Sequence, residues 1–230
     1  MRFFYLVRFT LLIPFTLFIG VASAYANQSD FNWSFDAGFL HLSPNDSSSE
    51  ISGPGLPPGN AVDVGSSSSV FGSLTYYYNE NWSSKIYLAP FMDFDVYAAG
   101  SLTGVGQIAS VEALFPTVFV NYTHTSLWKG VHPYIGVGLN YTLFDDEQPT
   151  AILNGALGGE TTVSLDSSVG LAAQLGLKVK LSPQWYLDIG YVYIDVDTTA
   201  NLSTAAVNTQ RSVDVSVDPA GTYLKFGYRF

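Results

Sequence analysis

Residue types that commonly carry out chemistry are sparse in this chain and poorly spaced for it. The three histidines, His41, His124 and His132, accompany no G-x-S-x-G segment, so a Ser/His hydrolase is unsupported. The 230 residues include no cysteine, and the scattered histidines lack the ligand spacing that zinc or an iron–sulfur cluster needs. We therefore predict no catalytic residues, no metal and no cofactor, and we expect that the chain is not an enzyme.

Two short motifs imitate ligand sites. Asp145-Asp146-Glu147 could gather a divalent cation, but adjacent carboxylates are more often a solvated loop. Gly136-Val137-Gly138 begins like a dinucleotide fingerprint, yet it lies inside an alternating segment and not at a strand-to-helix turn. We interpret these glycines as leaving room inside a barrel. A formal net charge of -10 argues against nucleic acid as a partner.

A third group of residues could bind a solute without reacting with it. These side chains are mostly apolar or aromatic and share one parity in alternating segments: Leu40, Phe71, Tyr77, Tyr87, Phe91, Phe115, Phe119, Tyr134, Phe144, Tyr186 and Val192. Such a lining favours apolar solutes over ions. We predict that a substrate path is lined by Leu40, Phe71, Tyr87, Phe91, Phe115, Phe119, Tyr134 and Phe144. The alternative, that they only fill and stabilise the interior, stays open.

The elements that position these residues are predicted from alternation with a period of two. Residues 133–144 place Ile135, Val137 and Leu139 on one face, and Gly136 and Asn140 on the other. The same division recurs in residues 166–181, 185–193 and 222–230, and more weakly in residues 32–42, 69–78, 82–91 and 113–124. The pattern predicts about eight strands, each with one apolar face.

The connections between these segments alternate between short and long. Short ones fall at residues 79–81, 125–132 and 182–184, and long ones at residues 43–68, 93–112, 145–163 and 198–211. Short periplasmic turns and long external loops produce this alternation in outer-membrane barrels. The fold class predicted is all-β, an eight-stranded antiparallel transmembrane β-barrel.

The N-terminus predicts export. Arg2 and Arg8 precede an uncharged apolar run at residues 9–21, and an A-x-A pattern follows it. We predict a signal peptide at residues 1–26, with cleavage after Ala26, and an outer-membrane β-barrel domain at residues 27–230. A membrane anchor helix is the weaker interpretation, because Pro14 interrupts the run and no stop-transfer charges follow.

Aromatic residues make up 15% of the chain, which suits a protein with rings at lipid–water boundaries. Trp33, Trp82 and Trp185 fall at the starts of predicted strands, and Trp128 lies in a short connection. We expect all four at the periplasmic interface, in one girdle with Tyr78, Tyr122, Tyr228 and Phe230.

A soluble β-sandwich is the structural alternative, since it also alternates. Against it stand the export signal and a final strand with Leu224, Phe226, Tyr228 and Phe230 on one face. Such a terminal aromatic strand resembles the recognition signal for outer-membrane insertion. The barrel assembly machinery is therefore an expected partner.

Residues 133–144, PYIGVGLNYTLF, resemble the central strand of the OmpW family of outer-membrane proteins. The likeness extends to Leu88-Ala89-Pro90-Phe91 and to Leu114-Phe115-Pro116-Thr117, where Phe115 replaces the first of two prolines. The resemblance is tight over about residues 88–144 and looser elsewhere. It implies an eight-stranded barrel with a hydrophobic lumen that takes up small apolar molecules and releases them through a lateral opening.

Two functions from different classes follow from these observations. The first is a passive channel for small hydrophobic molecules in the bacterial cell outer membrane. The second is a structural or receptor barrel whose external loops bind partners, and a barrel enzyme ranks well behind both. Outer-membrane lipids, lipopolysaccharide and small hydrophobic solutes are the expected partners. An eight-stranded barrel is too narrow for a general porin.

Overall fold

The computed structural model describes residues 32–45, 47–48, 58–125 and 128–230. The predicted signal peptide at residues 1–26 lies outside this part and stays a prediction. Within the described residues, no helix has both the length and the apolar character needed to cross a membrane.

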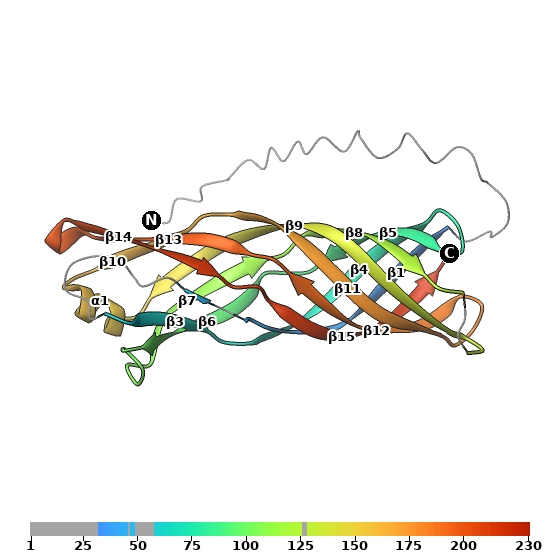
Figure 1. The fold of residues 1–230 in the computed structure, drawn as a ribbon, viewed down its shortest axis with the longest axis horizontal. Helices are drawn as coiled ribbons and strands as arrows, with labels where there is room; N and C mark the ends of the chain where they lie inside the picture. Colours follow the sequence, from blue (N-terminus) through green and yellow to red (C-terminus); the bar gives the residue numbers. More distant parts are fainter. Residues whose placement is uncertain (1–31, 46, 49–57, 126–127) are drawn as a thin grey trace, which may run out of the picture.

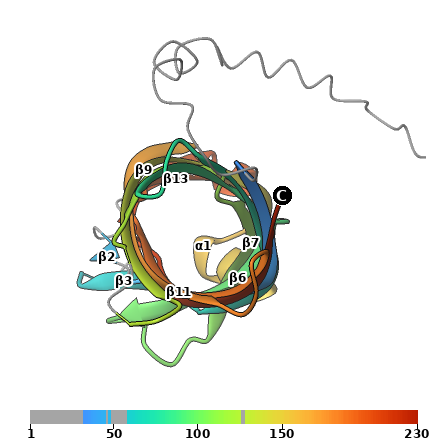
Figure 2. The same cartoon turned by 90° about the vertical axis from the view of Figure 1, so that its right-hand side faces the viewer.

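Eight antiparallel strands close into a ring (Figures 1 and 2). In ring order they are β1 (Trp33–Ser43), β4 (Ser67–Tyr77), β5 (Trp82–Leu88), β8 (Thr117–Thr123), β9 (Val131–Pro149), β11 (Ser168–Lys180), β12 (Trp185–Ile194) and β15 (Ala220–Arg229). Pairing of β15 with β1 closes the ring. Each strand coincides with one of the eight alternating segments, so the predicted eight-stranded barrel is confirmed.

The outward face of this ring is apolar and the inward face is mixed. Val137 is 70% exposed and Val169 is 74% exposed, whereas Asp188 and Lys225 have no exposed surface at all. A soluble sandwich would bury its valines and solvate its charges. The β-sandwich alternative is therefore wrong.

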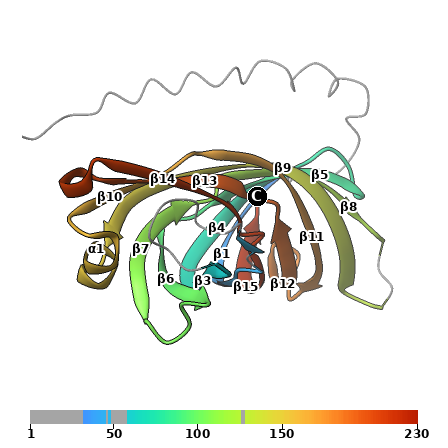
Figure 3. The same ribbon diagram turned by 60° about the vertical axis from the view of Figure 1, so that its left-hand side comes forward.

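Beyond the ring, the wall continues as further strands at the end away from the short turns (Figure 3). They are β2 (Ser47–Ser48), β3 (Asn60–Val64), β6 (Met92–Gly100), β7 (Gln107–Leu114), the last residues of β9, β10 (Thr161–Leu165), β13 (Asp197–Thr204) and β14 (Thr209–Ser216). A helix, α1 (Ala151–Leu157), and a 3-10 turn, η2 (Ala205–Val207), complete this extension. The described parts of the four long connections are therefore largely strands and not loops, and their inward apolar residues alternate with outward polar ones.

Outward carboxylates mark where the apolar band ends. Asp93 pairs with Glu112, and Glu112 pairs with Asp145, across β6, β7 and β9. We call Asp93, Glu112 and Asp145 the carboxylate belt. Charge is costly at the lipid face, so the belt sets the outer limit of the lipid-facing band.

The opposite limit carries the tryptophans. Trp33, Trp82 and Trp185 begin β1, β5 and β12 as expected. Their rings lie against neighbouring aromatic side chains, with Trp82 5.2 Å from Tyr122 and Trp185 stacked 4.8 Å from Phe226. Aromatic girdles of this kind sit at membrane interfaces.

One wall segment is out of step with its neighbours. The β5–β8 ladder pairs Ile86 with Val118, but the next ladder, β6–β7, pairs Met92 with Ala113. The chain from β5 to β6 therefore contains one more residue than its neighbour over the same span. Inward residues are odd-numbered in β5 and even-numbered in β6, so the faces exchange at Pro90. The neighbouring chain from β3 to β4 makes the same exchange near Gly65. Inward Val64 has an even number, whereas inward Phe71 has an odd number, so the inward parity changes between them.

Candidate functional site

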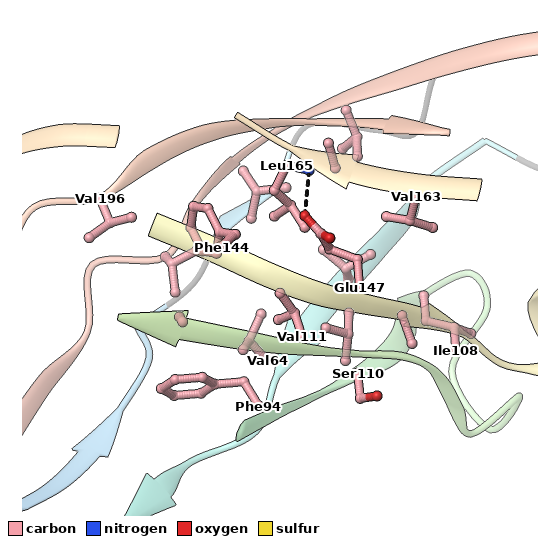
Figure 4. Close-up of a pocket in the computed structure, with 18 of the residues that line it drawn as sticks. Val64, Phe94, Ile108, Ser110, Val111, Phe144, Glu147, Val163, Leu165 and Val196 are labelled. Carbon is pink, nitrogen blue, oxygen red and sulfur yellow. Dashed lines mark hydrogen bonds between the residues drawn. The ribbon is translucent and has the colours of Figure 1, made fainter. Parts of the chain in front are cut away.

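An apolar cavity occupies the extension inside the barrel wall (Figure 4). Its empty space is about 940 Å³, including the part that opens to solvent. Nine of its 22 lining residues are valines, contributed by β3, β6, β7, β10, β14 and the segments next to β13 and β14, and Phe94, Phe115 and Phe144 lie at its lower end. Among the described residues that line it, only Ser110 and Glu147 are polar. Small hydrophobic ligands are typically bound in cavities of this composition.

The side of the cavity toward the short turns is closed by what we call the charged layer: Asp36, Lys85, Lys178, Asp188 and Lys225. Asp188 accepts from Lys85 Nζ at 3.1 Å and from Lys225 Nζ at 3.3 Å. Lys225 Nζ also lies 2.7 Å from Asp36 Oδ1. Buried charges persist only when they are paired and hydrogen-bonded, and here each carboxylate has a cation.

Tyrosines and amides fill the remaining space in the same layer. Tyr134 donates to Asp188 Oδ1 at 2.7 Å, and Tyr186 donates to Asp36 Oδ2 at 3.0 Å. Gln174 bonds both Tyr87 and Asn121. The eight ring strands all contribute side chains, so the layer spans the lumen and leaves no apolar route along the axis.

Glycines opposite the tyrosines create the room for them. Gly227 pairs with Tyr186 across β15 and β12, and a Cβ at Gly227 would lie 2.3 Å from the Tyr186 ring. Gly138 lies against Phe119 in the same way, with its added Cβ 2.8 Å from the ring. The prediction that Gly136 and Gly138 leave room inside the barrel agrees with this packing, since a Cβ at Gly136 would meet Asn121.

Helix α1 covers the outer end of the cavity. Its buried residues, Leu153 and Leu157, pack in an apolar cluster with Ile108, Leu202 and Val213. Thr150 caps the helix by accepting from Leu153 N, and Gly158 ends it with a φ of +85°. Viewed along the barrel axis, α1 projects into the lumen (Figure 2).

The strand pairing below the cavity is interrupted at the out-of-step segment. Residues 89–91 form no ladder pair on either side, because β4–β5 pairing ends at Gly72–Leu88 and β3–β6 pairing begins at Val64–Val96. Proline has no N–H to donate, so Pro90 reinforces the break. We call residues 89–91 the Pro90 window. It lies on the lipid side of Asp93; outward Leu88 borders it, and outward Phe91 is its last residue.

The predicted path residues divide into three groups in the structure. Phe115 and Phe144 line the cavity. Leu40, Phe71, Tyr87, Phe119 and Tyr134 are buried inside the barrel below the cavity. The inward assignment of Phe91 is wrong: it is 40% exposed, because the extra residue turns Met92 and Phe94 inward in its place.

Sequence reasoning missed most of the cavity, because its lining residues fall in regions predicted as loops. A signal was present in Met92-Asp93-Phe94-Asp95-Val96 and in Val213-Asp214-Val215-Ser216-Val217, which alternate strictly. In both segments the acidic residues face outward and the apolar residues face the cavity or its surrounding apolar cluster.

The carboxylate belt carries unrelieved like charges. The pKa of Glu112 is raised above its ordinary value of 4.5 by local desolvation and by the neighbouring carboxylates Asp93, Asp146 and Asp145. Like charges directly opposite on paired strands destabilise a sheet. Among the described residues, no group of three or more histidines and carboxylates is arranged to hold a metal ion.

Comparison with known proteins agrees with this geometry. A model described as the OmpW family matches residues 31–230. The Outer membrane protein W of Vibrio cholerae serotype O1 is 32% identical over 195 residues, which are 84% of this chain and 86% of the relative. The crystal structure of OprG from Pseudomonas aeruginosa superposes with a TM-score of 0.78 at 29% identity and covers 87% of this chain and 96% of that one.

A more distant relative carries an informative name. The dibenzothiophene metabolism operon protein PahQ of Pseudomonas aeruginosa is 20% identical over 227 residues, 98% of this chain and all of the relative.

A closed eight-stranded barrel with an apolar outer face and an aromatic girdle defines an outer-membrane β-barrel protein, and its relatives place it in the outer membrane of Gram-negative bacteria. Within that class, the chain belongs to the OmpW family.

Proposed function

We propose that this chain is a passive channel through which small hydrophobic molecules enter the outer membrane. The observation that carries the proposal is the cavity with its almost wholly apolar wall, placed directly above a charged layer. A solute held there gains apolar contacts, whereas the axial route would require it to displace paired buried charges.

The route out of the cavity is lateral in this proposal. Phe94 and Phe115 meet edge to face at 6.0 Å at the lower end of the cavity and flank the Pro90 window along their strands. Outward residues around the window are apolar, among them Val70 and Leu88. A hydrophobic solute that passes the window reaches lipid without crossing a polar surface.

The relative named for dibenzothiophene metabolism supports the class of solute, since dibenzothiophene is an apolar aromatic molecule. No catalytic group is needed for such passage, and the proposal is a channel and not an enzyme.

Uptake of radiolabelled octane by vesicles with lipopolysaccharide in the outer leaflet tests the proposal. Wild-type protein should accelerate uptake over protein-free vesicles. Phe115→Ser should slow it by roughly 10- to 150-fold, because losing an aromatic contact costs on the order of 1.5 to 3 kcal/mol of apolar transfer. The control is Val118→Ser, an outward residue that is 49% exposed.

Equal uptake by the wild type, Phe115→Ser and Val118→Ser would contradict the channel. So would wild-type uptake no faster than that of protein-free vesicles. Either result would favour the structural or receptor barrel.

A further inference from the structure

A second discontinuity in the wall lies above the carboxylate belt, between β9 and β10. The ladder between β9 and β11 ends at Thr142 and Ser168, yet β9 continues to Pro149 with β10 beside it. In the part of the chain that the structure describes, no ladder pair joins β9 to β10. Across the seam, Leu165 N donates to Glu147 Oε1 at 3.1 Å (Figure 4).

The two sides of β10 are held very differently. On one side, five consecutive pairs from Thr161–Thr204 to Leu165–Ala200 join it to β13. On the other edge, Leu165 N donates to the Glu147 carboxylate and Thr161 N donates to Asn154 of α1, and no backbone ladder joins the described residues. A strand with a full ladder on one edge and two side-chain bonds on the other separates first at the weaker edge.

The seam joins the cavity to a polar surface. Phe144, Val163 and Leu165 face the cavity, whereas Gln148, Thr162 and Ser164 are exposed on the outside. Because the seam lies beyond Asp145, it faces head groups and water. The Pro90 window, in contrast, lies on the lipid side of the belt.

Helix α1 gives this region a fixed edge and a movable edge. The Thr150 N–H donates to Ile108 O at 2.9 Å, so the start of the helix is fastened to β7. Its other end is fastened to β10, since Thr161 N donates to Asn154 Oδ1 at 3.0 Å. Gly158, with its positive φ, lies between the two. Movement of β10 away from β9 would carry the end of α1 with it and uncover the cavity.

We propose that β10 is the entry door of the cavity and that the Glu147 carboxylate is its latch. The inference rests on the proposed function and assigns its point of entry. Apolar solutes pass the open seam into the cavity, and the bond from Leu165 N to Glu147 closes the wall behind them.

Cysteine accessibility tests the door without any solute, because the chain has no cysteine of its own. The reporter is Val213→Cys, at a buried position that lines the cavity, and the control is its exposed neighbour Ser212→Cys. Reaction with a water-soluble maleimide is timed in the wild-type, Glu147→Ala and Glu147→Gln backgrounds.

Glu147→Ala should speed labelling of Val213→Cys about tenfold, which corresponds to about 1.4 kcal/mol. Glu147→Gln keeps an acceptor oxygen and should stay within about twofold of the wild type. Labelling of Ser212→Cys should be the same in all three backgrounds, which shows that the barrel is intact.

Unchanged labelling in Glu147→Ala, or equal acceleration in Glu147→Gln, would overturn the latch. Octane uptake by the wild type together with unchanged labelling would remove the door and leave the channel standing. Accelerated labelling without octane uptake would support the door and contradict the channel.

Discussion

At the scale of single residues, the charged layer is the most demanding feature of the barrel. Asp188 pairs with two lysines and accepts a hydrogen bond from a tyrosine, and all of these residues are buried. Alternation alone placed Asp188 and Lys225 on the inward face. Their pairing could not be predicted, because Lys85 and Asp188 are 103 residues apart and no local pattern connects them.

Asp188→Asn should destabilise the barrel by about 3 to 5 kcal/mol, because Lys85 would be left as a buried charge without its counter-ion. The free energy of unfolding of refolded protein in urea measures this loss. Asp146→Asn is the matched control: Asp146 is exposed, and its φ of +49° is one that asparagine also tolerates. Equal stability of the two variants would show that the charged layer contributes nothing.

At the scale of elements, the ring strands were predictable and the extension was not. A ring strand such as β11 alternates along its whole length between inward residues and lipid-facing residues that are mostly valine and leucine. Loops do not show such a pattern. The extension strands face water on the outside, so acids alternate with valines and the pattern resembles a polar loop. The extra residue between β5 and β6 could not be predicted from the sequence for another reason. It is recognised only by counting residues against those of the partner strand.

Removing the extra residue from both affected strands should close the Pro90 window. Deleting Pro90 and Ser66 together restores strict alternation through β5–β6 and β3–β4, so continuous ladders can form. Octane uptake should fall to that of protein-free vesicles, while the cavity still binds the solute. The control is the double substitution of Pro90→Ala with Ser66→Ala, which changes the same two residues but keeps the extra residue in each strand. Undiminished uptake by the Ser66 and Pro90 double deletion would contradict a lateral exit.

At the scale of the whole molecule, the tryptophans and the carboxylate belt set the depth of the barrel in the membrane. Leu139→Arg, at a position 62% exposed between these limits, should weaken folding into bilayers by about 2 to 4 kcal/mol. Gln148→Arg is the control, because Gln148 is an exposed residue of the same strand beyond Asp145. Folded yield in vesicles across a urea series compares them. Equal loss in both variants would show that the assigned depth is wrong.

The exchange of faces at Pro90 bears on how the passage of solutes through the proposed channel is controlled. Suppose that continuous ladders formed here with the present number of residues. Either Phe94 and Val96, or Phe71 and Tyr87, would then turn from the interior to the surface. In the proposed channel, the window would therefore stay open between passages and would not act as a valve. Control of passage would then act at an earlier stage, where a solute enters the cavity from the cell exterior.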